Sequence, residues 1–116
     1  MVLTDTIEID EDIFDISIGT SAKENWDILS TALQNDLWFH LGGNLSSPHI
    51  ILHIPENMKA RKIPKQAINK CAILCKMHSK YKDINRVSVI YTETKNVSKA
   101  GKIGSVFTKK ITSIVV

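Results

Sequence analysis

The sequence predicts an α+β fold, in which a mostly antiparallel or mixed sheet carries two main helices. Apolar and polar residues alternate in short runs, from residues 6–10 to residues 86–92, as they do in strands with one exposed face. Two longer segments, about 21–33 and 64–80, instead repeat apolar residues at helical spacing. With 116 residues, 43% of them hydrophobic and 23% charged, the chain is long enough for one core. No repeat or linker divides it, so we expect residues 1–116 to form a single domain.

The first half of the chain predicts four strands and one helix. Ser21 and Glu24 have the spacing of a capping box, and apolar residues follow at helical intervals from Ala22 through Trp26 and Leu29 to Leu33. The expected elements are, in order, strands at 6–10 and 13–18, a helix at about 21–33, a strand at 37–41, a turn at 42–44 and a strand at 48–54.

The second half begins with a polar, lysine-rich loop at 55–62 and a helix whose first turn suits Pro64. One side of this helix is apolar, with Ala67, Ile68, Cys71, Leu74, Cys75 and His78. The opposite side is basic and polar, with Lys65, Asn69, Lys76 and Lys80. The remaining expectations are a strand at 86–92, an irregular segment at 94–104, and a closing hairpin of 105–107 with 111–116 around residues 108–110.

Charge is divided very unevenly along the chain. Residues 1–58 hold one basic and ten acidic residues, a net charge of −9, whereas residues 59–116 hold fourteen basic and two acidic residues, a net charge of +12. This asymmetry predicts either a polyanionic partner such as nucleic acid or pairing between the two halves. The acidic segment 1–12 is expected to be peripheral, either as an edge strand or folded back on the basic face.

Several classes of protein are excluded or disfavoured by the same composition. No apolar run approaches the roughly 20 residues that span a bilayer, so we expect no membrane association. The acidic N-terminus is unlike a secretory signal, and two cysteines are too few for a disulfide scaffold. We therefore expect a cytoplasmic protein with reduced thiols.

The first candidate site combines aromatic, imidazole and hydroxyl groups. If strands 37–41 and 48–54 pair, Trp38 and His40 share one face, and His49 shares a face with Ile51 and His53. Together with Ser47 and its neighbour Ser46, these groups could stack a base and hydrogen-bond its edge or a ribose hydroxyl. The alternative is that Trp38 belongs to the core and the histidines satisfy buried hydrogen bonds.

Catalysis, metal binding and cofactor binding have little support. Proximity of Ser47 and His49 in sequence does not make a nucleophile and base, and the G-x-S-x-G and Walker A motifs are absent. Cys71 and Cys75 lie on the apolar side of a helix, where free cysteine behaves as a small hydrophobe rather than a zinc ligand. We therefore expect no enzyme activity, metal or cofactor.

The second candidate site is a loop rich in lysine and glycine. Lys95, Lys99 and Lys102 accompany Gly101 and Gly104, a combination that brings ammonium groups and backbone N–H groups to a phosphate. The following turn adds Lys109 and Lys110 to the basic surface. A solvated lysine-rich loop is the alternative.

These motifs resemble a known family. Asp36-Leu-Trp-Phe-His40, followed by Ser46-Ser-Pro-His49, is similar to the D-L-W-F-H and S-x-H motifs of the NFACT-R domain, the RNA-binding module of the NFACT proteins of ribosome-associated quality control. The likeness extends over residues 13–116. It includes Gly19, Asn25, Ile63-Pro64 with its helix, Val87 to Thr92, the Lys95 to Gly104 loop and the last strand, 111–116.

The resemblance implies an RNA-binding module near the translation machinery, with tRNA or rRNA and the large ribosomal subunit as partners. The RNA would be contacted by Trp38, His40, Ser47, His49, Lys95, Lys99, Lys102, Lys109 and Lys110. Thr20 stands where the family commonly has arginine, and the other domains of the large NFACT proteins are absent from this sequence, so a separate protein is expected to supply them. The alternatives are an adaptor that docks on the ribosome or an acidic protein, and a DNA-binding module.

Overall fold

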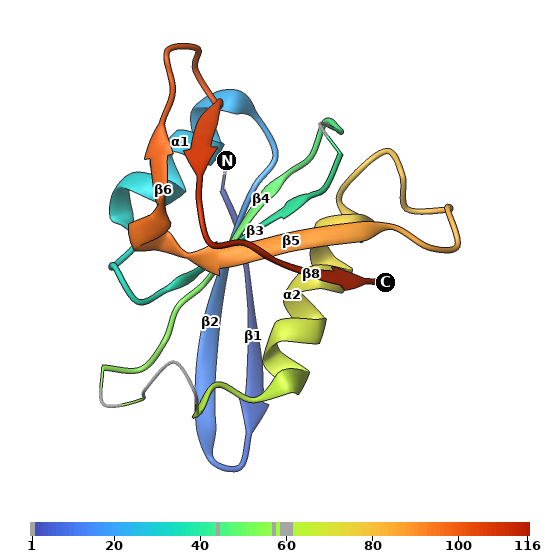
Figure 1. The fold of residues 1–116 in the computed structure, drawn as a ribbon. Coiled ribbons are helices and arrows are strands. Elements are labelled where there is room, and N and C mark those ends of the chain that lie inside the picture. The colour runs from blue at the N-terminus through green and yellow to red at the C-terminus, as the bar shows by residue number, and fades with distance from the viewer. Residues whose placement is uncertain (1, 44, 57, 59–61) are drawn as a thin grey trace.

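The described residues of this computed structural model are 2–43, 45–56, 58 and 62–116, and they contain two α-helices and two antiparallel sheets (Figure 1). The elements are β1 (Leu3–Ile9), β2 (Asp12–Gly19), α1 (Ala22–Thr31), β3 (Leu37–Leu41), β4 (His49–Leu52), α2 (Lys65–Met77), β5 (Ser88–Glu93), the 3-10 turn η2 (Thr94–Asn96), β6 (Val97–Lys99), β7 (Val106–Thr108) and β8 (Thr112–Val115). The predicted α+β class is confirmed.

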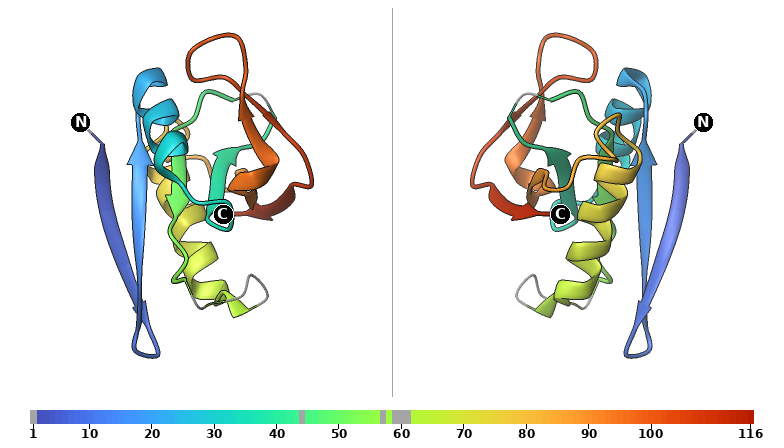
Figure 2. Two further views of the ribbon diagram at one scale, coloured as in Figure 1. Left: turned by 90° about the vertical axis from the view of Figure 1, so that its left-hand side faces the viewer. Right: turned by 90° about the vertical axis from the view of Figure 1, so that its right-hand side faces the viewer.

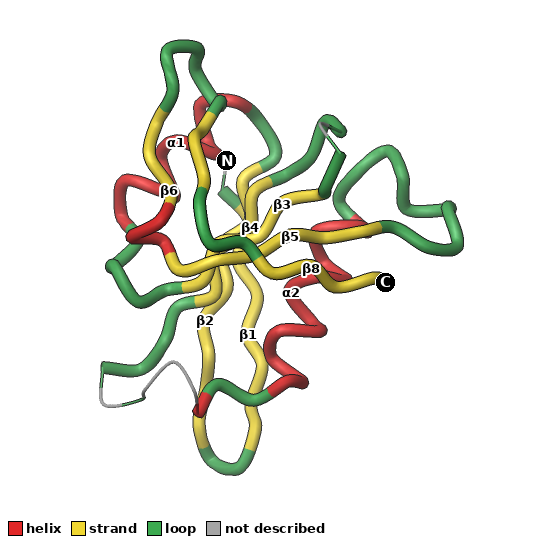
Figure 3. The backbone as a smooth tube through the Cα atoms, viewed as in Figure 1, coloured by secondary structure: helices red, strands yellow, loops and turns green. Residues whose placement is uncertain are grey.

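The main sheet has six strands in the order β1-β2-β4-β3-β5-β8, and every neighbouring pair is antiparallel (Figure 3). Residues 37–41 do pair with the strand that follows them, which is the condition set in the sequence analysis for the shared face, and Trp38 lies opposite Ile51. The acidic N-terminal segment forms the edge strand β1, which pairs with β2 over its whole length.

The two faces of this sheet are covered differently, as Figure 2 shows from both sides. Helix α2 packs through Ala67, Cys71, Ala72 and Cys75 on the face that carries Phe39. On the opposite face, α1 packs against β2 and β4, while the small β6–β7 hairpin places Val97 and Val106 against Trp38. Because side chains alternate along a strand, odd-numbered residues of β3 face α2 and even-numbered ones face α1 and the hairpin.

Local sequence explains where α1 begins and ends. The Ser21 hydroxyl accepts the Glu24 N–H at 3.2 Å, as the capping-box spacing predicts, while the Glu24 carboxylate accepts the N–H of Thr20 one residue earlier than in a standard capping box. The helix ends at Thr31, two residues short of the prediction, and Leu33 is 63% exposed rather than part of the buried side. Helix α2 similarly ends at Met77, which leaves His78 exposed.

The predicted closing hairpin is wrong, because β7 and β8 do not pair with each other. β7 pairs with β6, and β8 pairs with β5 at the edge of the main sheet. The segment 94–104, expected to be irregular, contains η2 and β6. Between the two sheets Lys110 takes a φ of 55°, and the Thr92 hydroxyl lies 3.2 Å from the carbonyl oxygens of Lys109 and Lys110. This turn sends the chain back along β5, so β8 completes the larger sheet.

Neither helix of the described chain combines the length and apolar character needed to cross a membrane.

Candidate nucleic-acid interface

Trp38 is the buried centre of the first predicted site. Only 1% of its surface is exposed, and it belongs to a cluster with Ile28, Leu29 and Ile51. One ring face stacks on His40 with a centroid distance of 5.5 Å and an interplanar angle of 20°. No open ring face is therefore left for a base, and of the two interpretations of Trp38 the structure places it in the core.

The indole N–H of Trp38 fixes the state of His49. It donates to His49 Nδ1 at 3.1 Å, so Nδ1 carries no proton and the neutral ring holds its proton on Nε2. Burial, reinforced by the nearby His40, lowers the pKa of His49 to about 3. The Asn25 side chain also accepts the His49 backbone N–H at 3.2 Å, which ties β4 to α1.

His40 has the opposite hydrogen-bonding polarity. Its Nδ1 lies 2.5 Å from the Leu41 carbonyl oxygen, which only accepts, so Nδ1 carries the proton and Nε2 is left as an acceptor. Burial lowers the pKa of His40, although the bond to the carbonyl opposes that shift. The two rings lie edge to face, 5.1 Å apart, so the site holds one imidazole donor and one imidazole acceptor without net charge.

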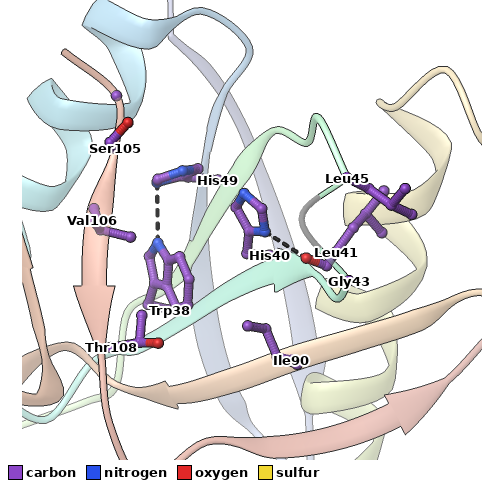
Figure 4. A pocket seen from close by; sticks show the side chains of 11 residues that line it. Trp38, His40, Leu41, Gly43, Leu45, His49, Ile90, Ser105, Val106 and Thr108 are labelled. Carbon is purple, nitrogen blue, oxygen red and sulfur yellow. Dashed lines mark hydrogen bonds between the residues drawn. The ribbon is translucent and has the colours of Figure 1, made fainter. Parts of the chain in front are cut away.

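These rings line a pocket of about 390 Å³ (Figure 4). One wall comes from β3 and β4, and the other from the hairpin side, including Gly104, Val106 and Thr108. Among the described residues, no buried side-chain nitrogen or oxygen lacks a hydrogen-bond partner. Of the two rings that line the pocket, His40 is half-buried and partly open to solvent, whereas His49 is only 1% exposed and meets the pocket with no more than an edge.

The structure does not bring Ser47 into this pocket. Its hydroxyl accepts the Leu41 N–H at 3.0 Å and donates to the Pro48 carbonyl at 2.7 Å. The same oxygen lies 3.4 Å from the sulfur of Cys75, on the side of the sheet that α2 covers. Through these contacts the Ser47 side chain links the turn between β3 and β4 to Cys75 of α2.

The Lys/Gly loop, in contrast, does meet the pocket, because the hairpin docks on α1. The Trp26 indole donates to the Ser105 carbonyl at 3.1 Å. Gly104 has a φ of +87°, and a Cβ added there would lie 2.8 Å from the Cβ of Ala22. Glycine is needed at this position both for the backbone conformation and for the close approach to the helix.

The five lysines predicted to contact phosphate differ in their surroundings. The Lys99 ammonium contacts the Ser30 hydroxyl and lies 5.4 Å from the centre of the Trp26 ring. Lys95 pairs with Glu93 at 3.3 Å. Lys102, Lys109 and Lys110 make no ion pair with any residue that the structure describes. Lys102, Lys109 and Lys110 are therefore the freer cations in and beside the hairpin, and the role of all five lysines in binding stays a prediction.

A second histidine cluster, which the sequence analysis missed, lies on the same face as the pocket. The buried Asp36 accepts from His53 Nδ1 at 3.1 Å, and His53 Nε2 lies 2.7 Å from the Ser17 hydroxyl. Asp36 also accepts the backbone N–H groups of Leu33 and Ile54, both at 2.9 Å. The hydrogen-bonded chain from Ser17 through His53 to Asp36 resembles a hydrolase triad. Ser17, however, lies within β2, which pairs with β1 on one side and with β4 on the other. Its neighbouring N–H groups therefore belong to the sheet ladders rather than to an oxyanion hole.

The two cysteines lie against the apolar face of the sheet. Burial raises the pKa of both thiols, that of Cys75 to about 11. Within the part of the chain that the structure describes, no three His, Cys, Asp or Glu side chains are grouped as metal ligands would be.

Comparison with known proteins finds a matching family model and several curated relatives. A family model described as "NFACT protein RNA binding domain" matches residues 6–111. Coiled-coil domain-containing protein 25 of Mus musculus and of Bos taurus are each 32% identical in an alignment of 102 positions, and the match covers 83% of this chain and 49% of theirs. The protein of the same name from Danio rerio is 32% identical in an alignment of 95 positions, and the match covers 77% of this chain and 45% of that protein. The chain thus spans about half the length of these curated relatives.

The fold has also been solved in another protein. The C-terminal part of the fibronectin/fibrinogen-binding protein from Streptococcus suis matches with a TM-score of 0.80 and 23% identity, covering 96% of this chain and 43% of that one. At this identity the likeness establishes the fold alone.

Proposed function

The chain belongs to the family of NFACT protein RNA-binding domains, and on that premise we propose that it binds RNA through the β6–β7 hairpin and the pocket beneath it. One observation carries the proposal: the hairpin that holds the freest lysines is also a wall of the histidine pocket. Ammonium groups for phosphates and a neutral recognition pocket therefore lie side by side.

The chemistry of the pocket suits a nucleoside better than a phosphate. His49 offers an N–H donor and His40 a nitrogen acceptor, and both rings are neutral at physiological pH because burial lowers their pKa. A ribose hydroxyl is both donor and acceptor, and a base edge presents both kinds of group. The lysines would supply affinity and its dependence on salt, while the pocket would supply discrimination.

The kind of RNA is a finer proposal, which the resemblance of the sequence motifs supports. We propose tRNA or rRNA, encountered in the cytoplasm near the large ribosomal subunit as part of ribosome-associated quality control. An RNA-binding family favours a non-catalytic module.

The salt dependence of RNA binding tests the role of the hairpin. We expect Lys102→Ala combined with Lys109→Ala to reduce the slope of log K against log[salt] by roughly 1–2 units, because each phosphate contact contributes about 0.7–0.9. The matched control is Lys80→Ala with Lys82→Ala, which removes the same charge near the end of α2, where Lys80 lies over Tyr81. An equal change in both double variants would contradict a specific hairpin interface.

Crosslinking of the protein to RNA in its own cells, with ribosome fractionation, tests the finer proposal. Enrichment of tRNA or large-subunit rRNA that is lost in the Lys102/Lys109 variant would support it. Ribosome association that survives nuclease treatment would contradict it and favour a protein adaptor, and preferential recovery of DNA would favour a DNA-binding module.

A further inference from the structure

The outer face of the β6–β7 hairpin carries an exposed aromatic side chain. Ser98 pairs with Phe107, whereas the flanking pairs Val97–Thr108 and Lys99–Val106 turn the other way, toward Trp38 and α1. Phe107 consequently points away from the domain and is 68% exposed, the highest value among the large apolar side chains of the described chain. The hairpin thus has an inner face that completes the pocket and an outer face that no element of the described chain covers.

Phe107 lies beside a shallow hollow rather than on a flat surface. The hollow has a volume of about 200 Å³, and its lining includes Lys95, Asn96, Ser98, Phe107 and Lys109. Lys95 is held by Glu93, so Lys109 is the cation that remains for an anionic ligand. An aromatic ring, amide and hydroxyl groups, and an ammonium group are therefore combined within one small site.

This combination fits a nucleotide with an unpaired base. An aromatic side chain stacks on a base of any sequence, and adjacent cations hold the backbone phosphates. A base within a duplex has both faces covered by its neighbours and cannot use such a site. A purely apolar partner would leave Lys109 without a counter-charge, whereas a phosphate supplies one.

We propose that the outer face of the hairpin is a second RNA-contact site, at which Phe107 stacks on an unpaired base and Lys109 holds a phosphate beside it. The proposal rests on the proposed function, since it assumes that the bound polyanion is RNA, and it adds a preference for single-stranded segments. RNA would then contact both faces of the hairpin, the pocket on the inside and Phe107 on the outside.

Substitution of Phe107 tests this directly. Fluorescence anisotropy is measured with a 12-nucleotide oligouridine and with a 12-base-pair RNA duplex, over a series of salt concentrations. We expect Phe107→Leu to weaken binding of the single strand about tenfold, because leucine keeps apolar bulk but cannot stack, and to change duplex binding less than twofold. Phe107→Trp should keep or increase the affinity for the single strand.

The salt series separates stacking from electrostatics. For Phe107→Leu, the line of log K against log[salt] should be displaced parallel to the unmodified protein, because no phosphate contact is removed. Ile73→Ala, which removes a 48% exposed apolar side chain on α2, is the control and should change neither affinity. Thermal unfolding verifies that all three variants remain folded, as expected for exposed positions.

The outcomes distinguish the two proposals. If the unmodified protein binds RNA but Phe107→Leu binds the single strand as tightly, the Phe107 site is wrong and the proposed function stands. If Phe107→Leu weakens single strand and duplex equally, the preference for unpaired bases is wrong. If the unmodified protein binds neither RNA, both proposals fail.

Discussion

The two faces of the main sheet are built from the same strands but have different chemistry. The face under α2 is mainly buried and apolar: Phe39 is fully buried and stacks on Tyr91, and even the thiols of α2 are held neutral by burial. The face under α1 and the hairpin holds polar rings, a pocket and the Asp36–His53–Ser17 cluster. A polar interior is costly unless each group is hydrogen-bonded, and here the bonds are present. The comparison assigns stability mainly to the first face and recognition mainly to the second.

Loss of packing on the α2 face should have the largest effect on stability. Phe39→Ala removes a fully buried ring between the sheet and α2, and we expect the free energy of unfolding to fall by about 3–5 kcal/mol. Urea denaturation measures this loss. RNA affinity of the fraction that remains folded should change less than twofold, and a large change in that affinity would show that the two faces are not separable.

Acid should destabilise the recognition face through His49. Because the folded-state pKa is about 3 and the unfolded value is near 6.5, the unfolded chain binds one more proton between these values, so stability falls as the pH is lowered through this window. Between pH 7 and pH 5 we expect a loss of about 2 kcal/mol from His49.

The variant His49→Asn isolates this contribution. Asparagine can accept the Trp38 indole N–H near the position of Nδ1 but does not titrate. Urea denaturation at pH 7 and at pH 5 should show a smaller pH dependence in the variant, by about 2 kcal/mol. Parallel pH dependence in both proteins would mean that His49 is not the titrating group.

Docking of the hairpin should depend on a single glycine. Gly104→Ala forces a side chain into the contact with Ala22 at a positive φ, and we expect a loss of about 1–2 kcal/mol in stability and weaker RNA binding. Gly101→Ala is the matched control, because a Cβ added at Gly101 meets nothing within 4 Å. Similar effects of the two substitutions would argue against the close packing of the hairpin on α1.

The smallest effect is expected from thiol reagents. Cys71 and Cys75 are fully buried, and burial raises their pKa, so the folded protein should show almost no labelling by a thiol-specific reagent at pH 8. Labelling should become complete in denaturant. Rapid labelling under native conditions would show that the α2 face opens readily.

Helices and strands could be predicted from the sequence because apolar residues recur in each at a characteristic spacing. The helices follow from a period of 3.6, and the common face of Trp38 and His40 follows from a period of 2. The partners of β7 and β8 could not be predicted in this way, because a strand of three residues, such as β6, is too short to show alternation.

The unpredicted parts of the candidate site depend on contacts between distant segments. The hydrogen-bonded cluster draws on three separate segments, which hold Ser17, Asp36 and His53, and no local sequence pattern predicts its hydrogen bonds. The outward orientation of Phe107 depends on which strand β7 pairs with, so the incorrect hairpin concealed it. Burial of Trp38 likewise becomes clear only once the hairpin is placed over it.

The route of the chain between β5 and β8 has a consequence for how such a domain diversifies. The hairpin leaves the sheet after Glu93 and returns at Thr112, and Tyr91 pairs with Thr112, so the two ends of this excursion are neighbours. Insertions or deletions within it leave the register of β5 and β8 unchanged. Natural selection, or a protein engineer, can therefore exchange the binding hairpin for another length or composition while the sheet and its α2 face stay as they are.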